Sequence, residues 1–242
     1  MCDYQMGDTV RNPIPIPFRF APSVRGTDNT PLPGEFMRDG AVSDEDVVGS
    51  FIEPNYETLH NPMTADYLSM KRAVLGDSIE WNYADSTAGY RSLPPHMAAL
   101  PMLSHCVLDR YDWSERGYPE RKRVANSRYY DHIKFVLEEI CHANGFHPEF
   151  YRIGLNFTQF SRSQGCPIHR DHEFPHYQML VYLTNFMGGW TWIDGQRCID
   201  PIEDGVICFD GEQRHHHEPP YGPDDRRIVL VSTFKPVEIP DG

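Results

Sequence analysis

Short runs of β-branched and aromatic residues fill the last third of the chain, and Gly-Gly and Asp-Gly pairs separate many of them. Runs of this length and composition, bounded by turn-forming residues, predict β-strands. The expected strands span residues 150–160, 167–171, 178–183, 190–193, 205–209, 213–217 and 228–234. So many short strands in succession are typical of an antiparallel sandwich or barrel.

Two segments between residues 61 and 150 show the periodicity of amphipathic helices instead. The first has Thr64 as a candidate N-cap and Gly76 as a stop, and its helical spacing is carried by Tyr67, Leu68, Lys71, Val74 and Leu75. The second begins at Asn126 or Ser127 and ends at Asn144-Gly145, with a stripe of Tyr129, Tyr130, Ile133, Val136, Leu137, Ile140 and Cys141. We expect this second helix, over residues 127–143, to pack on the outside of the larger sheet.

The first 60 residues lack periodicity and are rich in proline and glycine. Such a segment is expected to form an extended arm and not a domain. The chain is therefore divided into an N-terminal arm at 1–60 and one domain at 61–242. Within that domain, residues 61–149 supply helical support and residues 150–236 the β core.

Charge and cysteine usage narrow the functional classes. The 242 residues include 22 Lys and Arg against 35 Asp and Glu, a net charge of −13. Phosphate backbones and anionic membranes repel a chain of this charge, so nucleic acid is an unfavoured partner and no membrane is expected. The six cysteines form no C-x-x-C pair, and the start lacks the pattern of a secretory signal. We expect a cytoplasmic protein with reduced thiols; its oligomeric state is left open.

One basic group stands out in this acidic chain, and it consists of Arg110, Arg116, Arg121, Lys122 and Arg123. A solvated face paired with neighbouring acids is the ordinary interpretation. A patch that binds an acidic substrate is the alternative.

The candidate chemistry begins with His169-Arg170-Asp171. In a strand, alternate side chains share a face, so His169 and Asp171 would present an imidazole and a carboxylate together. These are two ligand types for a divalent metal. A hydrogen-bonded surface pair is the ordinary alternative for this short motif.

A third ligand is available in His215-His216-His217, which follows the apolar run 206–209. Two imidazoles and one carboxylate form the facial set of non-haem Fe(II) oxygenases, which leaves coordination positions open. His217 would share the face of His215, and His216 would point away. Exposed loop histidines are the alternative.

Arg226-Arg227 opens the last apolar strand, so one guanidinium is expected on each face. The inward guanidinium is suited to bidentate binding of a carboxylate. Arg227 shares its face with the small residues Val229 and Val231, which favours it, whereas the spacing from His215 favours Arg226 slightly. Both remain candidates.

Taken in order, these stretches resemble the Fe(II)- and 2-oxoglutarate-dependent oxygenases, in particular the prolyl-4-hydroxylase-like branch. The matching stretches are His169-Arg170-Asp171, Tyr182-Leu183-Thr184-Asn185, Gly188-Gly189-Trp190-Thr191-Trp192-Ile193, Ile207-Cys208-Phe209, His215 and Arg226-Arg227. Upstream, residues 71–76 and Trp81-Asn82-Tyr83 are similar to oxygenases of bacterial viruses and marine bacteria.

The resemblance implies a mainly β fold with flanking helices, a double-stranded β-helix or jelly roll. It implies Fe(II) on His169, Asp171 and His215, with His215 preferred over His217 because it lies six residues after Phe209. Tyr182 and one strand arginine would hold 2-oxoglutarate, and O2 would be the second cosubstrate. The implied activity is a dioxygenase that hydroxylates a substrate and releases succinate and CO2.

The substrate is not identified by the sequence, and a small molecule, an amino acid or a peptidyl residue all fit. Two other classes stay open: a cupin-type metal enzyme that does not use 2-oxoglutarate, and a non-enzymatic β-sandwich binding module. The cupin-type enzyme would need the same metal ligands but neither Tyr182 nor a strand arginine.

Overall fold

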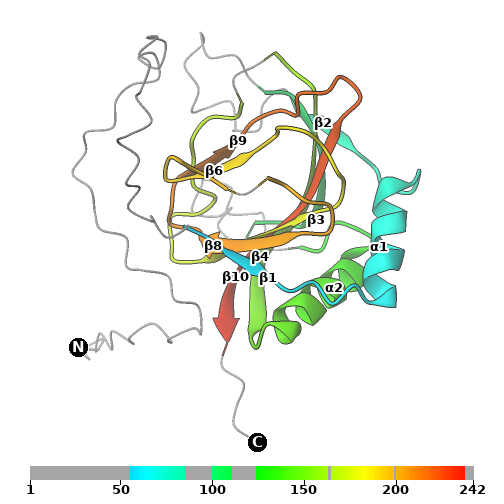
Figure 1. Ribbon diagram of the computed structural model, residues 1–242. Coiled ribbons are helices and arrows are strands. Elements are labelled where there is room, and N and C mark those ends of the chain that lie inside the picture. Colours follow the sequence, from blue (N-terminus) through cyan, green and yellow to red (C-terminus); the bar gives the residue numbers. More distant parts are fainter. Residues whose placement is uncertain (1–54, 85–99, 111–123, 163–164, 199, 238–242) are drawn as a thin grey trace, which may run out of the picture.

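The computed structural model describes residues 55–84, 100–110, 124–162, 165–198 and 200–237, which form two antiparallel sheets and two helices (Figure 1). The larger sheet has the strand order β1-β8-β5-β10-β4-β3-β2 and the smaller one β7-β6-β9. The strands are β1 (Glu57–Leu59), β2 (Asn82–Ala84), β3 (Met102–Leu108), β4 (His147–Gln159), β5 (Tyr177–Tyr182), β6 (Thr191–Ile193), β7 (Gln196–Arg197), β8 (Val206–Asp210), β9 (His215–His217) and β10 (Arg226–Val237). The helices are α1 (Ala65–Leu75) and α2 (Tyr130–Ala143). The expectation of a mainly β fold with flanking helices is confirmed.

The central strands bury both of their faces. On β5, Met179 and Val181 belong to a hydrophobic cluster shared with both helices, whereas Leu180 and Tyr182 belong to a second cluster on the other face. Alternate side chains of a strand point to opposite faces, so one uninterrupted apolar run serves both clusters. The larger sheet thus has a face covered by helices and a face turned toward the smaller sheet.

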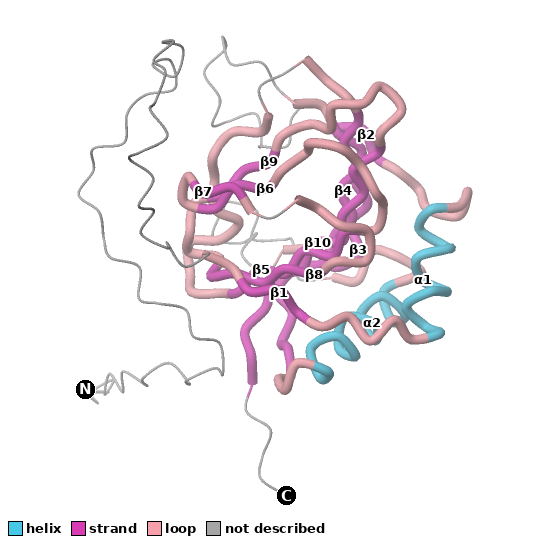
Figure 2. The backbone as a smooth tube through the Cα atoms, viewed as in Figure 1, coloured by secondary structure: helices cyan, strands magenta, loops and turns pink. Residues whose placement is uncertain are grey.

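Both helices lie along the same side of the larger sheet (Figure 2). Five of the seven residues expected in the stripe of α2 are buried, and α2 contacts β3 and β4. The helix begins at Tyr130, later than expected, because Ser127 forms a turn ahead of it: its hydroxyl accepts the amide hydrogen bond of Tyr129 at 3.0 Å. The predicted packing on the outside of the larger sheet is confirmed.

The ends of α1 are as predicted, but its stripe is not. Thr64 caps the helix by accepting the Tyr67 amide hydrogen bond at 3.1 Å, and Gly76 ends it. Leu68 and Leu75 were expected on the buried face, yet 44% and 42% of their surface is exposed. The residues that are buried are Tyr67, Met70 and Val74.

Three other expectations need correction. Residues 167–171 are not a strand, and only an isolated bridge joins His169 to His215. The expected support segment 61–149 is not only helical, because it also contributes β2 and β3 to the larger sheet. The described end of the expected arm forms β1, which pairs with β8; residues 1–54 lie outside the described part.

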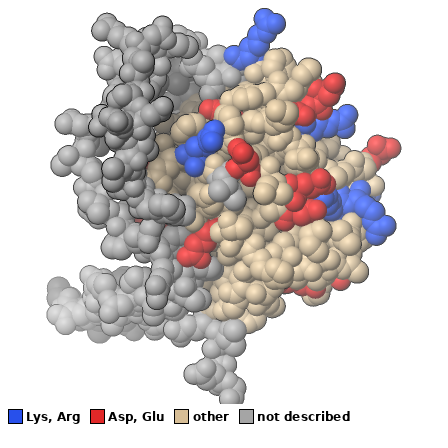
Figure 3. Space-filling view, viewed as in Figure 1, with Lys and Arg blue, Asp and Glu red and all other residues tan. Residues whose placement is uncertain are grey.

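Acidic and basic side chains are interspersed over the described part of the face seen in Figure 3. Among the described residues, neither helix has the length and apolar character needed to cross a bilayer.

Candidate metal centre

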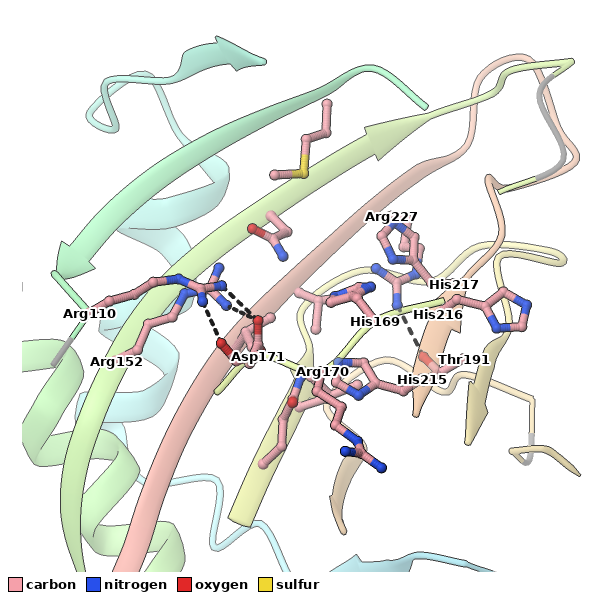
Figure 4. A pocket seen from close by; sticks show the side chains of 16 residues that line it. Arg110, Arg152, His169, Arg170, Asp171, Thr191, His215, His216, His217 and Arg227 are labelled. Carbon is pink, nitrogen blue, oxygen red and sulfur yellow. Dashed lines mark hydrogen bonds and ion pairs between the residues drawn. The ribbon is translucent and has the colours of Figure 1, made fainter. Parts of the chain in front are cut away.

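A pocket of about 180 Å³ lies between the two sheets. Figure 4 shows the side chains that line it, which come from strands of both sheets and from the segment around His169. They are Met102, Arg110, Arg152, Asn156, His169, Arg170, Asp171, Gln178, Leu180, Thr191, His215, His216, His217, Arg227, Val229 and Val231. Among the sequence-predicted site residues, the pocket gathers His169, Asp171, His215 and Arg227.

His169 and His215 are placed opposite each other by their own backbones. Each amide donates a hydrogen bond to the other residue's carbonyl oxygen, both at 3.0 Å. The two ring centroids are 4.7 Å apart. The two residues are 46 positions apart in the sequence, and the bridge between the segments brings their imidazoles into one site.

The hydrogen bonds of the two imidazoles fix which nitrogen can act as a ligand. Nδ1 of His169 lies 2.7 Å from the Pro167 carbonyl oxygen, and Nδ1 of His215 lies 3.2 Å from that of Gln213. A carbonyl oxygen only accepts, so Nδ1 carries the hydrogen and Nε2 holds the lone pair of a neutral ring. Backbone carbonyls orient metal-ligating histidines in this way. Nε2 of His215 is buried and has no hydrogen-bond partner among the described residues.

The pKa values of the two imidazoles shift in opposite directions. Burial lowers the pKa of His215 to about 4, so its ring is neutral at neutral pH. Burial would also lower the pKa of His169, but a hydrogen bond with Cys166 and the negative charge of Asp171 outweigh it and raise that pKa to about 8.

The other two histidines of β9 are engaged elsewhere. Both ring nitrogens of His217 have partners: Nε2 lies 3.3 Å from the Thr158 hydroxyl and Nδ1 lies 3.2 Å from the Cys166 sulfur. The His216 ring stacks on Trp192 with an interplanar angle of 8°. Of the three histidines, only His215 presents an unpartnered buried nitrogen in the described part of the chain.

The Asp171 carboxylate lies in the same pocket but faces two arginines (Figure 4). Its Oδ1 accepts hydrogen bonds from Arg110 at 2.8 Å and Arg152 at 2.9 Å. Burial would raise the pKa of Asp171, but the two guanidinium groups hold it well below its usual value. As the side chains stand, no three His, Cys, Asp or Glu residues of the described chain are close enough together to hold a metal ion. The two imidazoles are assembled, and the carboxylate is turned away from them.

The two strand arginines have different surroundings. Arg226 is exposed, whereas Arg227 is buried in the pocket. Arg227 donates hydrogen bonds to the Gly189 carbonyl oxygen at 3.0 Å and to the Thr191 hydroxyl at 3.1 Å. Burial lowers its pKa from the usual value, yet a guanidinium stays protonated at neutral pH. Arg227 has no carboxylate partner among the described residues and is therefore a buried positive charge available to an anion.

Tyr182 does not line this pocket, but its hydroxyl contacts Thr191, which does. Tyr182 is fully buried, which raises its pKa to about 12, and its hydroxyl lies 2.9 Å from that of Thr191. Thr191 in turn accepts from Arg227, so the Tyr182 hydroxyl is linked to the guanidinium through Thr191. The guanidinium carbon of Arg227 also lies 5.9 Å from the centre of the Tyr182 ring.

The sequence analysis placed Thr191 in a matching stretch but gave it no role, and it did not single out Arg152 or the contact of Arg110 with Asp171. A threonine in a strand carries no signal of its own in a single sequence. Arg152 and Asp171 are 19 positions apart and Arg110 and Asp171 are 61 apart, so only the folded chain brings them together.

Comparison with known proteins supports the fold. No protein-family model matches the chain, and no curated protein sequence matches it. A solved structure described as an oxidoreductase of the 2OG-Fe(II) oxygenase family from Burkholderia pseudomallei is similar over 76% of this chain and 86% of that one, with a TM-score of 0.50 and 12% identity. The chain thus has the fold of that oxygenase structure, a jelly roll, as the sequence predicted.

Weaker similarities point to structures with related descriptions. A prolyl hydroxylase from Trichoplax adhaerens, solved with a hypoxia inducible factor peptide, matches 74% of this chain and 83% of its own at 13% identity and a TM-score of 0.47. A prolyl-4-hydroxylase from Pseudomonas putida matches 76% and 94% at 13% identity and a TM-score of 0.40.

Proposed function

We propose that the protein is a non-haem Fe(II)- and 2-oxoglutarate-dependent dioxygenase. The observation that carries this proposal is the Nε2 atom of His215, buried without a hydrogen-bond partner among the described residues, opposite His169 and in one pocket with the buried Arg227. A lone pair and an unneutralised positive charge are costly in a protein interior unless ligands satisfy them. A metal ion would satisfy the lone pair of His215, and a carboxylate would neutralise the charge of Arg227.

The donor set fits iron. His169 and His215 present Nε2 atoms oriented by backbone carbonyls, and Asp171 is ionised at neutral pH. With a pKa of about 8, His169 would release a proton on binding a metal ion. Two imidazoles and one carboxylate are the set that non-haem Fe(II) enzymes use, with positions left open for other ligands. Asp171 would complete the set by turning from Arg110 and Arg152 toward the imidazoles.

The same pocket fits 2-oxoglutarate. Its distal carboxylate would pair with Arg227, and the Thr191 hydroxyl, which Tyr182 holds in place, would orient the guanidinium. Gly189 fixes the other side of the guanidinium through its carbonyl oxygen. Val229 and Val231 line the same pocket as Arg227, and their apolar side chains would limit the access of water to the bound anion.

Iron held by these residues would supply, with 2-oxoglutarate and O2, the oxidising power for hydroxylation, with succinate and CO2 as coproducts. The chain's own residues would bind and orient these groups: His169, His215 and Asp171 would hold the metal, and Arg227 would orient the cosubstrate. The substrate would be a small molecule, an amino acid or a peptidyl residue.

Anaerobic equilibrium dialysis against Fe(II), with and without 2-oxoglutarate, tests the metal ligands. Wild-type protein should retain equimolar iron and, only in its presence, equimolar 2-oxoglutarate. His215→Ala should lose iron by removing a ligand, and His216→Ala is the matched control, because that ring stacks on Trp192. Far-UV circular dichroism checks that both variants fold.

Equal iron retention by both variants would contradict His215 as a ligand. Protein that retains iron but no 2-oxoglutarate would belong instead to the cupin-type metal enzymes.

A further inference from the structure

The pocket between the sheets is basic although the chain is acidic. Four arginines and a single carboxylate, that of Asp171, are among its lining residues, while the whole chain has a net charge of −13. Clefts lined by one sign of charge concentrate ligands of the opposite sign. One anionic cosubstrate at Arg227 accounts for only one of these four arginines.

Two of the others, Arg110 and Arg152, converge on one oxygen atom. Arg110 follows β3 and Arg152 lies on β4, and both donate to Oδ1 of Asp171, at 2.8 and 2.9 Å. Arg110 also donates to the backbone carbonyl oxygen of Asp171. Each arginine side chain keeps only 19% of its surface exposed. Two guanidinium groups aimed at one carboxylate oxygen form a ready-made anion site.

We propose that Arg110 and Arg152 bind an anionic group of the substrate, a carboxylate or a phosphate, at the site that the Asp171 carboxylate occupies in this structure. The inference rests on the proposed function, because it assigns Asp171 to the metal during turnover.

The charges of the loaded site explain why an anion is needed. Iron and Arg227 together are balanced by Asp171 and the two carboxylates of 2-oxoglutarate. Asp171 is the only acidic partner that Arg152 has in the described part of the chain. Removing the partner of a mostly buried guanidinium leaves an uncompensated charge, which strongly destabilises the folded protein. An anionic substrate would restore that partner, so metal loading prepares the site for the substrate.

A second cavity shows where the rest of the substrate would lie. It measures about 270 Å³ and shares Met102, Arg110, Arg152 and Asn156 with the first. The arginine pair stands where the two cavities meet. An anionic group held there would leave the body of the molecule between the metal pocket and the surface of β3 and β4.

Calorimetric titration of the full-length, metal-free protein with acetate and with inorganic phosphate tests the site without any catalysis. Asp171→Ala removes the internal carboxylate and should raise the affinity for at least one of these anions by tenfold or more. Adding Arg152→Gln to Asp171→Ala should abolish that gain. Glu212→Ala, which removes one exposed negative charge, is the control and should leave the affinity at the wild-type value.

A gain for acetate alone assigns a carboxylate, and a gain for phosphate alone assigns a phosphate. The inference is overturned if Asp171→Ala shows no gain for either anion, or if Arg152→Gln leaves the gain intact.

A second arm uses wild-type protein loaded with Mn(II) and 2-oxoglutarate, and it also serves if Asp171→Ala does not fold. Loading should raise anion affinity over the metal-free protein, and Arg152→Gln should remove the rise. If Asp171→Ala binds the anion more tightly but loading the wild-type protein does not raise its anion affinity, the anion site stands and Asp171 is refuted as a metal ligand. If neither arm shows an increase in anion affinity while the protein still binds metal and 2-oxoglutarate, the anion site is refuted and the proposed function stands.

Discussion

Gly189 shows how one residue can position the proposed anchor for 2-oxoglutarate. Its φ is +61°, a backbone conformation that residues with a side chain rarely adopt, and its carbonyl oxygen accepts a hydrogen bond from Arg227. A Cβ added there would lie 2.8 Å from the Phe186 ring and 3.3 Å from Cδ of Arg227. The glycine therefore provides both the turn and the space beside the guanidinium.

Gly189→Ala should lower the free energy of unfolding more than Gly195→Ala does. Gly195 also has a positive φ, +78°, but a Cβ there meets nothing within 4 Å. Left-handed backbone costs a non-glycine residue about 1–2 kcal/mol, which both variants share, so the difference between them measures the clash with Phe186. Urea denaturation measures both values. Equal reductions in the free energy of unfolding would show that Phe186 and Arg227 move aside for the added Cβ without an energetic penalty.

At the scale of elements, β10 joins the two halves of the molecule. Its outer face places Phe234, which is fully buried, against the rings of Phe146 and Phe150, with centroids 5.5 and 6.2 Å away. Its inner face carries Arg227, Val229 and Val231 into the pocket. One strand therefore supports the helices on one side and the candidate site on the other.

Phe234→Ala should destabilise the protein by about 3–5 kcal/mol, the usual cost of truncating a buried phenylalanine. Val237→Ala, at an exposed position of the same strand, should change stability by less than about 0.5 kcal/mol. Thermal and urea unfolding provide the comparison. A small loss for Phe234→Ala would mean that the core around Phe146 collapses into the cavity.

The sequence predicted most clearly the strands whose side chains are apolar on both faces, such as β5, β8 and β10. β3 escaped prediction because polar and apolar residues are mixed in Met102–Leu108, so no clean alternation is present. Residues 167–171 were wrongly expected to form a strand, since local composition does not reveal that only His169 finds a backbone partner. The contacts of Asp171 with Arg110 and Arg152 depend on tertiary packing, which a single sequence does not encode locally.

At the scale of the whole molecule, a buried thiol and a buried phenol determine how stability responds to alkaline pH. Burial raises the pKa of Cys198 and of Tyr182 to about 12 each. Their folded-state pKa values exceed the unfolded values of about 8.5 and 10, so the unfolded chain releases these protons first as pH rises. Stability should therefore fall above about pH 8.5 because of Cys198 and additionally above about pH 10 because of Tyr182, by about 1.4 kcal/mol per pH unit for each group.

Chemical denaturation between pH 8 and pH 11 measures this slope. Cys198→Ala should make the slope shallower because one titrating group is removed, whereas Cys106→Ala, at an exposed position, should leave it unchanged. An unchanged slope in Cys198→Ala would show that this thiol is not protected in the folded chain.

Anaerobic titration of 2-oxoglutarate into the Fe(II)-loaded protein, followed by metal-to-ligand charge-transfer absorbance, tests the central claim most directly. The band arises only when the keto acid chelates iron, so it reports both ligands at once. Arg227→Ala should weaken 2-oxoglutarate binding by more than tenfold, since each charge-assisted hydrogen bond is worth about 1.5–3 kcal/mol. Arg226→Ala, at the exposed neighbouring position, should bind as wild type does. A wild-type protein that holds iron but gives no such band, or an Arg226→Ala variant weakened as much as Arg227→Ala, would contradict the account.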